Sequence, residues 1–452
     1  MIDTAHYLIG TPFLSAMVIA LFPQSRARAV ATLLGLFGII VNCVCVYMKY
    51  VSGPRSIDSV SFLFVTLTAV TVMAAILLTP PETHSKNRFY SLIFLTQMGL
   101  NIAFIETTAL WFYVGWEAAL IPSLVMIVGW GGDNRRSAAT RFLLYTLVGS
   151  LMMLGSILTL YLHYGTTDWN LLSTTIIPGW LQLVVFCGFF AAFAVKLPVF
   201  PLHSWQASTY LESNIPTGVI LSAIFSKLGV YGLYRLVTIL APDISFSLAT
   251  PVICVCIFGS IYSAVAAFGQ SNLKRVIAFA SMSHINTVAA AMFASPTLGI
   301  TGALIFSVSH TVISIGLWWA VAILKRRFGH TRLHEITGGI VAEHRFFTAV
   351  MFLITLSAMA VPLTSGFPGE FLMLQSIIRY KLALGILATF PMVLGAIYML
   401  RAYHTLMLGK PNTSHGPVTL TASETIIGGT LGLAIIIIGV YPQFIFQLLT
   451  HL

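Results

Sequence analysis

The sequence contains very little charge. Only 8% of its 452 residues are Asp, Glu, Lys or Arg, whereas 58% are hydrophobic and the mean hydropathy is +0.92. A soluble protein of this length does not need so much apolar side-chain surface, so the composition excludes that class. Runs of about 20 apolar residues recur along the whole length, as membrane-spanning helices require. The sequence therefore predicts an all-α protein that crosses the bilayer many times.

Nucleotide motifs and a metal-binding framework are also missing. Neither G-x-G-x-x-G after a strand nor G-x-x-x-x-G-K-[ST] occurs, and no polar connection is long enough to fold alone. Zinc and iron–sulfur sites need about four ligands, and no His or Cys partner pattern flanks the cysteines. The cysteines all fall inside apolar runs and are predicted to be buried small hydrophobic residues: Cys43, Cys45, Cys187, Cys254 and Cys256. Nucleotide chemistry and electron transfer are therefore expected elsewhere.

The apolar runs predict fourteen membrane spans. The first of them begins within MIDTAHYLIG, which lacks the charged start and cleavage site of a removable signal. The runs lie near 6–22, 29–51, 59–79, 89–107, 109–130, 137–163, 176–197, 216–240, 250–270, 275–294, 297–324, 345–381, 383–409 and 422–449.

The net charge of +10 does not indicate nucleic-acid binding, because the basic residues lie in short loops between the apolar runs. Most of them follow odd-numbered spans, and these are Arg26, Arg28, Lys86, Arg88, Arg135, Arg136, Arg141, Lys274, Arg275, Lys325, Arg326, Arg327, Arg332, Arg345 and Lys410. The loops after even-numbered spans hold only Lys49, Arg55, Arg379 and Lys381. The odd loops are predicted to face the cytoplasm or matrix, and both termini the opposite side.

Six of the titratable residues inside the apolar runs are candidates for function, because a charged side chain there costs about 2.5–3.5 kcal/mol on insertion scales. They are Glu117, Lys196, Lys227, His284, His310 and Glu370. All six can bind and release protons at a depth that protons do not otherwise reach. We therefore predict that they form a path for ions, with protons as the expected cargo.

Structural roles are the alternative for each of these residues. A lysine can pair structurally or extend its amine to the interface, although Lys227 lies at least ten residues from either end of its run. Glu370 follows Pro368 and Gly369, so its role could be purely that of a cap at the N-terminus of a half-helix. A carboxylate is favourable there because of the helix dipole. A single histidine on a helix is often just a satisfied core residue.

Two of the runs are broken by prolines. AVKLPVFP, from Ala194, and AVPLTSGFPGE, from Ala360, each combine two prolines with one titratable residue. Paired broken helices are typical of transporter sites, and backbone carbonyls that a break leaves unpaired can hold water or line a cavity. If Glu117 approaches Lys196, the lysine keeps its proton, and if Glu117 withdraws, the lysine passes the proton on.

Five segments together resemble one known family. They are FYVGWEAALIPSL, FAVKLPVFPLHSW, ILSAIFSKLGVYGLYR, NLKRVIAFASMSHIN and GFPGEF, and they keep their order and spacing between Trp111 and Arg401. They resemble the subunit 4 family of NADH:ubiquinone oxidoreductase, respiratory complex I, whose bacterial members are the antiporter-like chains M. The first hundred residues match this family only in hydropathy.

The resemblance implies a single polytopic domain over 1–452, with two inverted five-helix repeats and discontinuous helices 7 and 12. Helices 1–3 would occupy about 1–87, the repeats 88–240 (helices 4–8) and 250–409 (helices 9–13), and helix 14 residues 420–452. The family's proton-transfer residues match Glu117, Lys196, Lys227, His284, His310 and Glu370, and His203 is a weaker candidate.

The resemblance also implies a proton-translocating subunit of an enzyme, driven by quinone reduction elsewhere in the complex. NADH, FMN, iron–sulfur clusters and ubiquinone would bind to other subunits, and this chain would bind no cofactor and no metal. Expected partners are other membrane-arm subunits, including neighbouring antiporter-like ones, and lipids, with no nucleic acid. The compact length favours the mitochondrial inner membrane over a bacterial plasma membrane.

The segment after Trp205 departs from the family pattern. Glu212 stays in register and His203 is retained, but Tyr210 stands where the family has histidine and Asn214 where it has proline. A relay through that histidine would here need Tyr210 and ordered water instead.

Two other functions remain open from the sequence. A multi-subunit sodium/proton antiporter shares the Glu/Lys pattern, although such relatives more often carry lysine at the position of Glu370. The other alternative is an inert spacer of a membrane arm. The insertion cost of six titratable groups argues against it, because a spacer does not need them.

Overall fold

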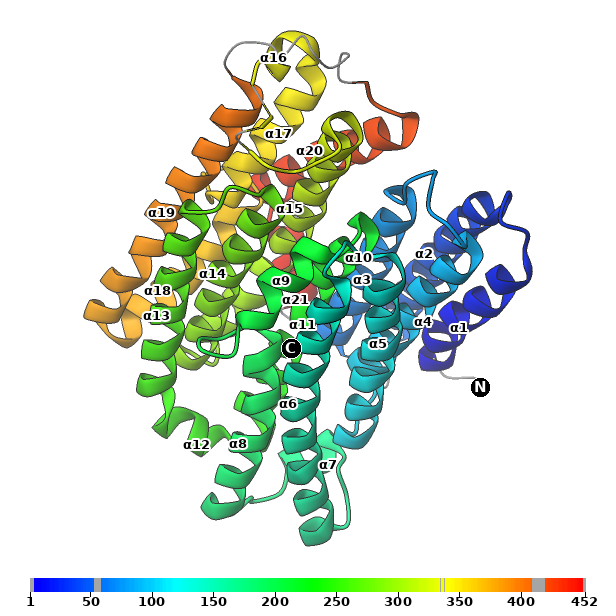
Figure 1. Cartoon of the computed structure of the whole chain (residues 1–452). Coiled ribbons are helices and arrows are strands. Elements are labelled where there is room, and N and C mark those ends of the chain that lie inside the picture. The colour runs from blue at the N-terminus through cyan, green and yellow to red at the C-terminus, as the bar shows by residue number, and fades with distance from the viewer. Residues whose placement is uncertain (1–3, 53–57, 334, 337, 409–418, 450–452) are drawn as a thin grey trace. The chain divides into compact units, whose positions relative to one another are not determined.

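The computed structural model describes residues 4–52, 58–333, 335–336, 338–408 and 419–449, and its named elements are all helices (Figure 1). Arg55 and Lys410, used above for orientation, lie outside the described residues. The helices form two compact units. One comprises the described parts of 1–196 and 212–247 with Leu449, and the other comprises 197–211 and 248–448.

The first unit begins with six long helices, and its helical segment 215–240 contains two π-helical turns. Its elements are α1 (Thr4–Leu21), α2 (Ala27–Ser52), α3 (Ser59–Leu77), α4 (Lys86–Ile105), α5 (Ala109–Trp130), α6 (Arg135–Tyr164), α7 (Trp169–Ser173), α8 (Gly179–Lys196), α10 (Ile215–Ile220), η1 (Leu221–Phe225), α11 (Ser226–Arg235), η2 (Leu236–Leu240) and α12 (Pro242–Ser247). Both η segments are π-helical turns.

The second unit is built around two long central helices. Its elements are α9 (Ser204–Glu212), α13 (Ala249–Phe268), α14 (Leu273–Ala294), α15 (Leu298–Phe328), α16 (Ile340–Glu343), α17 (Arg345–Ala358), α18 (Gly366–Tyr380), α19 (Leu382–Met407), α20 (Ala422–Val440) and α21 (Gln443–Leu449). Within the described part of the chain, α14 and α15 are the most buried membrane-length helices, which fits sequences that are apolar on every side.

Thirteen described helical segments are long and apolar enough to cross a membrane. The twelfth predicted run, 345–381, is divided into α17 and α18, which have 14 and 15 residues and reach only about 21–23 Å each. The predicted membrane fold is confirmed, with this crossing made by two half-helices. The last predicted run also contains a break, since α20 ends at Val440 before Pro442.

Both predicted breaks are confirmed, although the second lies at Pro362 alone, because Pro368 is the third residue of α18, where the first helical turn tolerates proline. Helix α8 ends at Lys196 and α9 begins at Ser204, with Pro198 and Pro201 between them. Helix α17 ends at Ala358 and α18 begins at Gly366; in the gap, Ala360 and Leu363 adopt left-handed backbone conformations. Such conformations cost a non-glycine residue about 1–3 kcal/mol, so neighbouring contacts must hold this segment in place.

Glycines let the two glutamate-bearing helices pack closely against their neighbours. A Cβ on Gly115 of α5 would collide with the backbone of Ala103 on α4, and one on Gly369 of α18 would lie 2.6 Å from the backbone nitrogen of Phe306 on α15. Small residues allow such close backbone approach between helices in a membrane. Glu117 and Glu370 follow these glycines by two residues and by one, so the close contacts fix where the carboxylates lie.

Each unit gathers its predicted odd-numbered loops at one end. In the first, Arg28 donates to the Leu77 carbonyl at 2.8 Å and Trp130 to the His84 carbonyl at 2.8 Å. In the second, Arg401 donates to the Phe268 carbonyl at 2.7 Å. These bonds join loops that the charge pattern assigns to the same membrane face.

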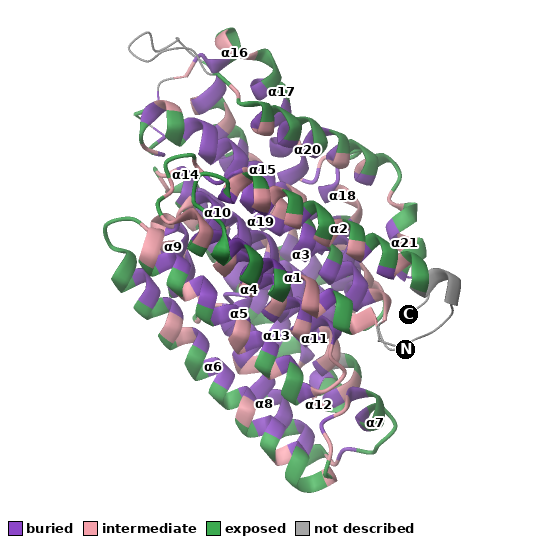
Figure 2. Ribbon diagram, turned by 90° about the vertical axis from the view of Figure 1, so that its right-hand side faces the viewer, coloured by how far each residue is buried: buried purple, intermediate pink, exposed green. Residues whose placement is uncertain are grey.

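Burial follows the inward faces of the helices, while exposed apolar residues cover their outward faces (Figure 2). Cys45 and Cys256 are buried, but Cys43, Cys187 and Cys254 are exposed. The prediction of burial was therefore wrong for these three cysteines. The position of a residue inside an apolar run does not show whether its side chain faces the other helices or the lipid, because lipid accepts apolar residues equally well.

Candidate functional site

Lys196 is the last residue of α8, directly before the first break, and only 1% of its surface is exposed. Three aromatic rings surround its amine: the Nζ atom lies 4.2 Å from the centroid of Phe225, 4.8 Å from that of Trp116 and 5.9 Å from that of Phe142. An ammonium is attracted to the face of an aromatic ring, by about 2 kcal/mol when desolvated. The site can therefore hold a charged lysine without a touching counterion.

Glu117 lies on α5 beside Trp116, one of those rings, and is half-buried. Its charge acts on Lys196, but the two described side chains form no direct ion pair. The carboxylate is thus near enough to influence the amine and still has to move to touch it. The predicted approach and withdrawal of Glu117 stays a prediction.

Lys227 lies on α11 two residues after the π-helical turn η1, and none of its surface is exposed. A π-turn inserts one residue into a helix and is frequent at functional sites, because it re-aims the side chains that follow. The amine does not reach the surface of the unit. That burial excludes the interfacial lysine considered from the sequence.

Glu370 lies just beyond the second break and is 5% exposed. The residue that caps α18 is Ser365, so Glu370 is the fifth residue of the helix and not its cap. Its Oε1 atom lies 3.9 Å from Nδ1 of His284 on α14. The capping alternative is therefore wrong, and Glu370 has a titratable neighbour instead.

His284 and His310 complete the group in the second unit. Their ring centroids are 6.5 Å apart, and Phe306 packs against both. The ring nitrogens of His310 lie within hydrogen-bond distance of two serine hydroxyls, Ser281 at 3.1 Å and Ser314 at 3.3 Å. A hydroxyl can donate and accept at once, so these serines can pass a proton along.

Side chains next to the two histidines hold the broken segments. Asn286, two residues after His284, donates to the Pro198 carbonyl at 3.3 Å. Ser309, directly before His310, donates to the Ser365 carbonyl, and Ser365 contacts the Ser357 hydroxyl at 2.7 Å. These bonds satisfy backbone groups that the breaks release, as the interior of a membrane demands.

His203 is the predicted residue that the structure leaves apart. It is half-buried within the first break, directly before α9, stacked on Phe200 at 5.5 Å and against Tyr262 at 5.1 Å. Within the described part of the chain, none of its contacts is with the other six predicted residues. Its packing accounts for its place in the fold.

The unusual segment after Trp205 has clear local roles. Asn214 caps α10 by accepting from the Thr217 N–H at 2.9 Å, and Glu212 accepts from the Asn134 N–H at 3.0 Å. Tyr210 is buried, and its hydroxyl interacts with the side chains of Gln206 and Ser281. Tyr210 therefore connects to His310 through Ser281.

Most of the side chains that complete these groups could not be recognised from the sequence. Trp116, Phe142 and Phe225 look like ordinary core residues, and Ser281 and Ser314 like ordinary small ones. Tyr398 on α19, buried and within the electrostatic reach of Glu370, was also missed. Helical spacing could have found only the serines, which lie three and four residues from a predicted histidine.

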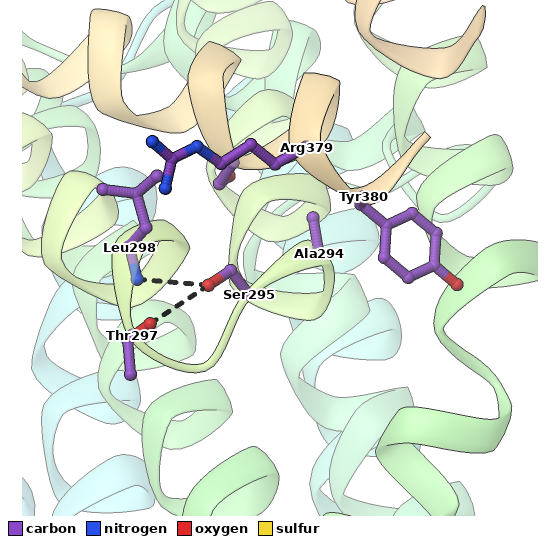
Figure 3. A pocket seen from close by; sticks show the side chains of 7 residues that line it. Ala294, Ser295, Thr297, Leu298, Arg379 and Tyr380 are labelled. Atoms are coloured by element: carbon purple, nitrogen blue, oxygen red, sulfur yellow. Dashed lines mark hydrogen bonds between the residues drawn. The ribbon is translucent and has the colours of Figure 1, made fainter. Parts of the chain in front are cut away.

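A polar pocket of about 350 Å³ lies at one end of the second unit (Figure 3). Ser295, Thr297, Arg379 and Tyr380 line it together with neighbouring backbone. Its edge at Leu298 is twelve residues from His310 on the same helix, or about 18 Å. The pocket is therefore separate from the titratable group.

Comparison with known proteins agrees with this geometry. The family model described as "NADH:quinone oxidoreductase/Mrp antiporter, TM" matches residues 106–395. NADH-ubiquinone oxidoreductase chain 4 of Arabidopsis thaliana is 32% identical over 96% of this chain and 93% of its own. NADH-quinone oxidoreductase subunit M of Rickettsia typhi is 34% identical over 78% of this chain and 72% of its own.

Solved structures share the fold. A chain of respiratory complex I from Thermus thermophilus superimposes with a TM-score of 0.88 at 27% identity, over 97% of this chain and 96% of that one. A chain of the Mrp complex from Dietzia also has a TM-score of 0.88, at 17% identity, over 99% of this chain and 96% of that one. At that identity the second likeness shows the fold alone.

The class of protein is thus a polytopic, all-helical membrane protein of the antiporter-like kind, with buried acids and bases beside two broken helices. The chain belongs to the NADH:quinone oxidoreductase/Mrp antiporter transmembrane family, among the chain 4 and subunit M members of NADH-quinone oxidoreductases. The predicted family is confirmed. The predicted pair of inverted repeats and its residue boundaries stay predictions.

Proposed function

We propose that this chain is a proton-translocating subunit of the membrane arm of an NADH:ubiquinone oxidoreductase in the mitochondrial inner membrane. The observation that carries the proposal is the placement of Lys196 directly before one helix break and of Glu370 in the second helical turn after the other. Broken helices at membrane depth are typical of transporter sites, because irregular backbone there lines a cavity that water and ions can enter. The mitochondrial and bacterial relatives named above support this assignment.

In the first unit, Lys196 would store the proton. The aromatic rings favour the ammonium, and the approach of Glu117 strengthens that preference, while its withdrawal weakens it. Such coupled groups titrate as a set, so moving one carboxylate changes the proton affinity of its neighbours. Lys227 would receive the proton next.

In the second unit, His284, His310 and Glu370 would carry the proton onward. Tyr210, Ser281 and His310 supply a row of hydroxyl and imidazole groups, each able to accept and donate. Tyr210 would thereby take the place of the family histidine. His203 has no assigned step in this route.

The energy for these steps would come from quinone reduction in other subunits, which would also hold NADH, FMN and the iron–sulfur clusters. This chain would bind no cofactor itself. Its partners would be other membrane-arm subunits, with neighbouring antiporter-like chains among them, and membrane lipids. A sodium/proton antiporter subunit is the alternative that the shared fold of the Mrp chain supports.

The test is Lys196→Ala in the complete complex, reconstituted into vesicles. NADH oxidation and proton uptake are measured together, with exposed Lys325→Ala as the matched control. We expect Lys196→Ala to abolish the proton uptake that depends on this subunit, because alanine cannot carry a proton at the break. Unchanged proton uptake would overturn the proposal, and purification with cation exchange but no NADH–quinone reductase activity would favour the antiporter.

A further inference from the structure

A second polar cluster in the first unit is not used by the path described so far. The Tyr231 hydroxyl lies 3.2 Å from the Ser61 hydroxyl and accepts from the Arg235 guanidinium at 2.9 Å. Arg235 also forms an ion pair with Asp58. Asp58 in turn accepts from the Ser61 backbone N–H at 2.7 Å, so these four residues form a closed network.

This network begins one helical turn from Lys227. Tyr231 is the fourth residue after Lys227 on α11, which places both side chains on the same face, about 6 Å apart along the axis. Both residues are completely buried. A row of groups therefore runs from Lys227 along one face of the helix.

The row leads to one end of the unit. Asp58 caps the first turn of α3, and its side chain is 34% exposed, whereas that of Arg235 is 13% exposed. Arg28 contacts Leu77 at the opposite end of α3, about 28 Å away. The network thus lies at the end opposite to the basic loops, on the side that the charge pattern assigns to the outside.

The ion pair is charged at neutral pH. Burial alone would raise the pKa of Asp58, but the Arg235 guanidinium and the Ser61 N–H more than offset this and hold that pKa below its usual value. Arg235 keeps its charge throughout the accessible pH range. A fixed positive charge therefore contacts the Tyr231 hydroxyl, and Asp58 keeps it in position.

We propose that Tyr231, Arg235 and Asp58 form an outer gate through which a proton from Lys227 leaves the first unit. The proposal rests on the proposed function and adds to it a route of release. In the step, the Lys227 ammonium gives a proton to the Tyr231 oxygen while the Tyr231 hydroxyl proton leaves toward Ser61 and solvent. Lys227 ends neutral and Tyr231 unchanged, so no other reactant is needed.

Arg235 raises the barrier of this gate and so limits leakage when the first unit does not drive a proton out. A proton returning from the outside has to approach the Tyr231 oxygen beside a guanidinium, and like charges repel strongly where little water screens them. Asp58 compensates the charge of Arg235 without removing it from the hydroxyl. Loss of Asp58 should release the guanidinium and let protons flow back.

The experiment uses the complete complex in vesicles and compares three variants with the wild type. Tyr231→Phe removes the relay hydroxyl, Asp58→Asn removes the anchor of Arg235, and Tyr234→Phe is the control, because the Tyr234 ring packs at 5.1 Å from the same guanidinium. Protons taken up per NADH oxidised, and the decay of the pH gradient after NADH is exhausted, are measured. Retained NADH oxidation shows that each variant assembles.

We expect Tyr231→Phe to cause at least half of the loss in protons per NADH that Lys196→Ala causes. Asp58→Asn should speed the decay of the pH gradient, and Tyr234→Phe should match the wild type. A merely structural role would lower NADH oxidation and proton uptake in parallel and would overturn the proposal. If Tyr231→Phe does not assemble, Ser61→Ala tests the same step by removing the next hydroxyl.

Wild-type behaviour of Tyr231→Phe and Asp58→Asn would also overturn the gate. If Lys196→Ala still abolishes pumping in that case, the proposed function stands and only the release route is wrong. If Lys196→Ala pumps normally, the proposed function itself fails.

Discussion

The two units keep their titratable residues in different surroundings. In the first, Lys196 faces three aromatic rings, and Glu117 influences it without direct contact. In the second, His284 lies within 3.9 Å of Glu370, and both ring nitrogens of His310 are within hydrogen-bond distance of serines. A carboxylate that controls a neighbouring amine by moving needs space between the two groups. A proton that passes between two side chains needs them within hydrogen-bond distance.

These different surroundings suit different tasks in proton transfer, although each lies beside a helix break. An amine among rings can stay charged while its carboxylate partner moves, so the first unit suits a switch. Imidazoles bonded to hydroxyls exchange protons without a large movement, so the second unit suits conduction. The two breaks look alike in sequence, and their neighbours make them different.

The largest effect is expected when the charge of Glu117, which acts on Lys196, is removed. Glu117→Gln keeps the shape of the side chain but removes its charge, and a carboxylate near a buried ammonium is worth on the order of 2 kcal/mol. We expect proton uptake to fall by more than about tenfold, since 1.4 kcal/mol corresponds to a factor of ten. Proton uptake by the reconstituted complex measures it.

Glu117→Asp is the matched control for that variant. It retains the charge and should recover much of the uptake. Equal loss in both variants would mean that side-chain length, rather than charge, matters at this position.

An effect of intermediate size is expected when the contacts around Lys196 and His310 are removed. Trp116→Leu removes a ring from Lys196, and Ser281→Ala removes a hydrogen-bond partner from His310; each contact is worth about 1 kcal/mol, or about fivefold in rate. Trp116→Phe should restore the first loss and Ser281→Thr the second. Rates of proton uptake at saturating NADH report the result.

Buried Ser376→Ala is the control for the serine, because the Ser376 hydroxyl donates to the Met373 carbonyl of its own helix. It should behave as the wild type. If it lowers uptake as much as Ser281→Ala does, hydroxyl loss acts through packing and not through His310.

The smallest effect concerns stability and pH. The folded-state pKa of Asp58 is lower than the unfolded value, so its contribution to stability is fully present above about pH 4 and is lost as the pH falls through the folded pKa. Asp58→Asn should therefore be less stable than the wild type at pH 7 by no more than about 1 kcal/mol, because the pair is partly exposed. The difference should shrink toward pH 3.

Thermal denaturation midpoints of the detergent-solubilised complex, taken between pH 7 and pH 3, measure this shift. The control lies in the second unit, where Arg332 and Glu335 pair at the surface and their hydrogen bond raises the pKa of Arg332. Glu335→Gln should leave the midpoint unchanged at every pH. A constant difference for Asp58→Asn across this range would contradict the linkage.

Much of the fold could be predicted from the sequence because membrane burial leaves few options. Every backbone group must be satisfied within a helix, and each helix must span about 30 Å, so apolar length alone located the spans. Prolines cannot continue a helix without losing a hydrogen bond, which made the breaks at Pro198 and Pro362 predictable. The position of Glu370 in its helix was not, because capping depends on which residue starts the turn.

The sequence by itself determined the class of protein, the broken helices and the six candidate titratable residues, since the cost of a charge in hydrocarbon marks each of them. Only the tertiary structure decided what surrounds those residues. The rings around Lys196, the serines beside His310 and the network from Tyr231 to Asp58 come from segments far apart in the chain. Their contacts arise from packing between helices, which periodicity and composition do not encode.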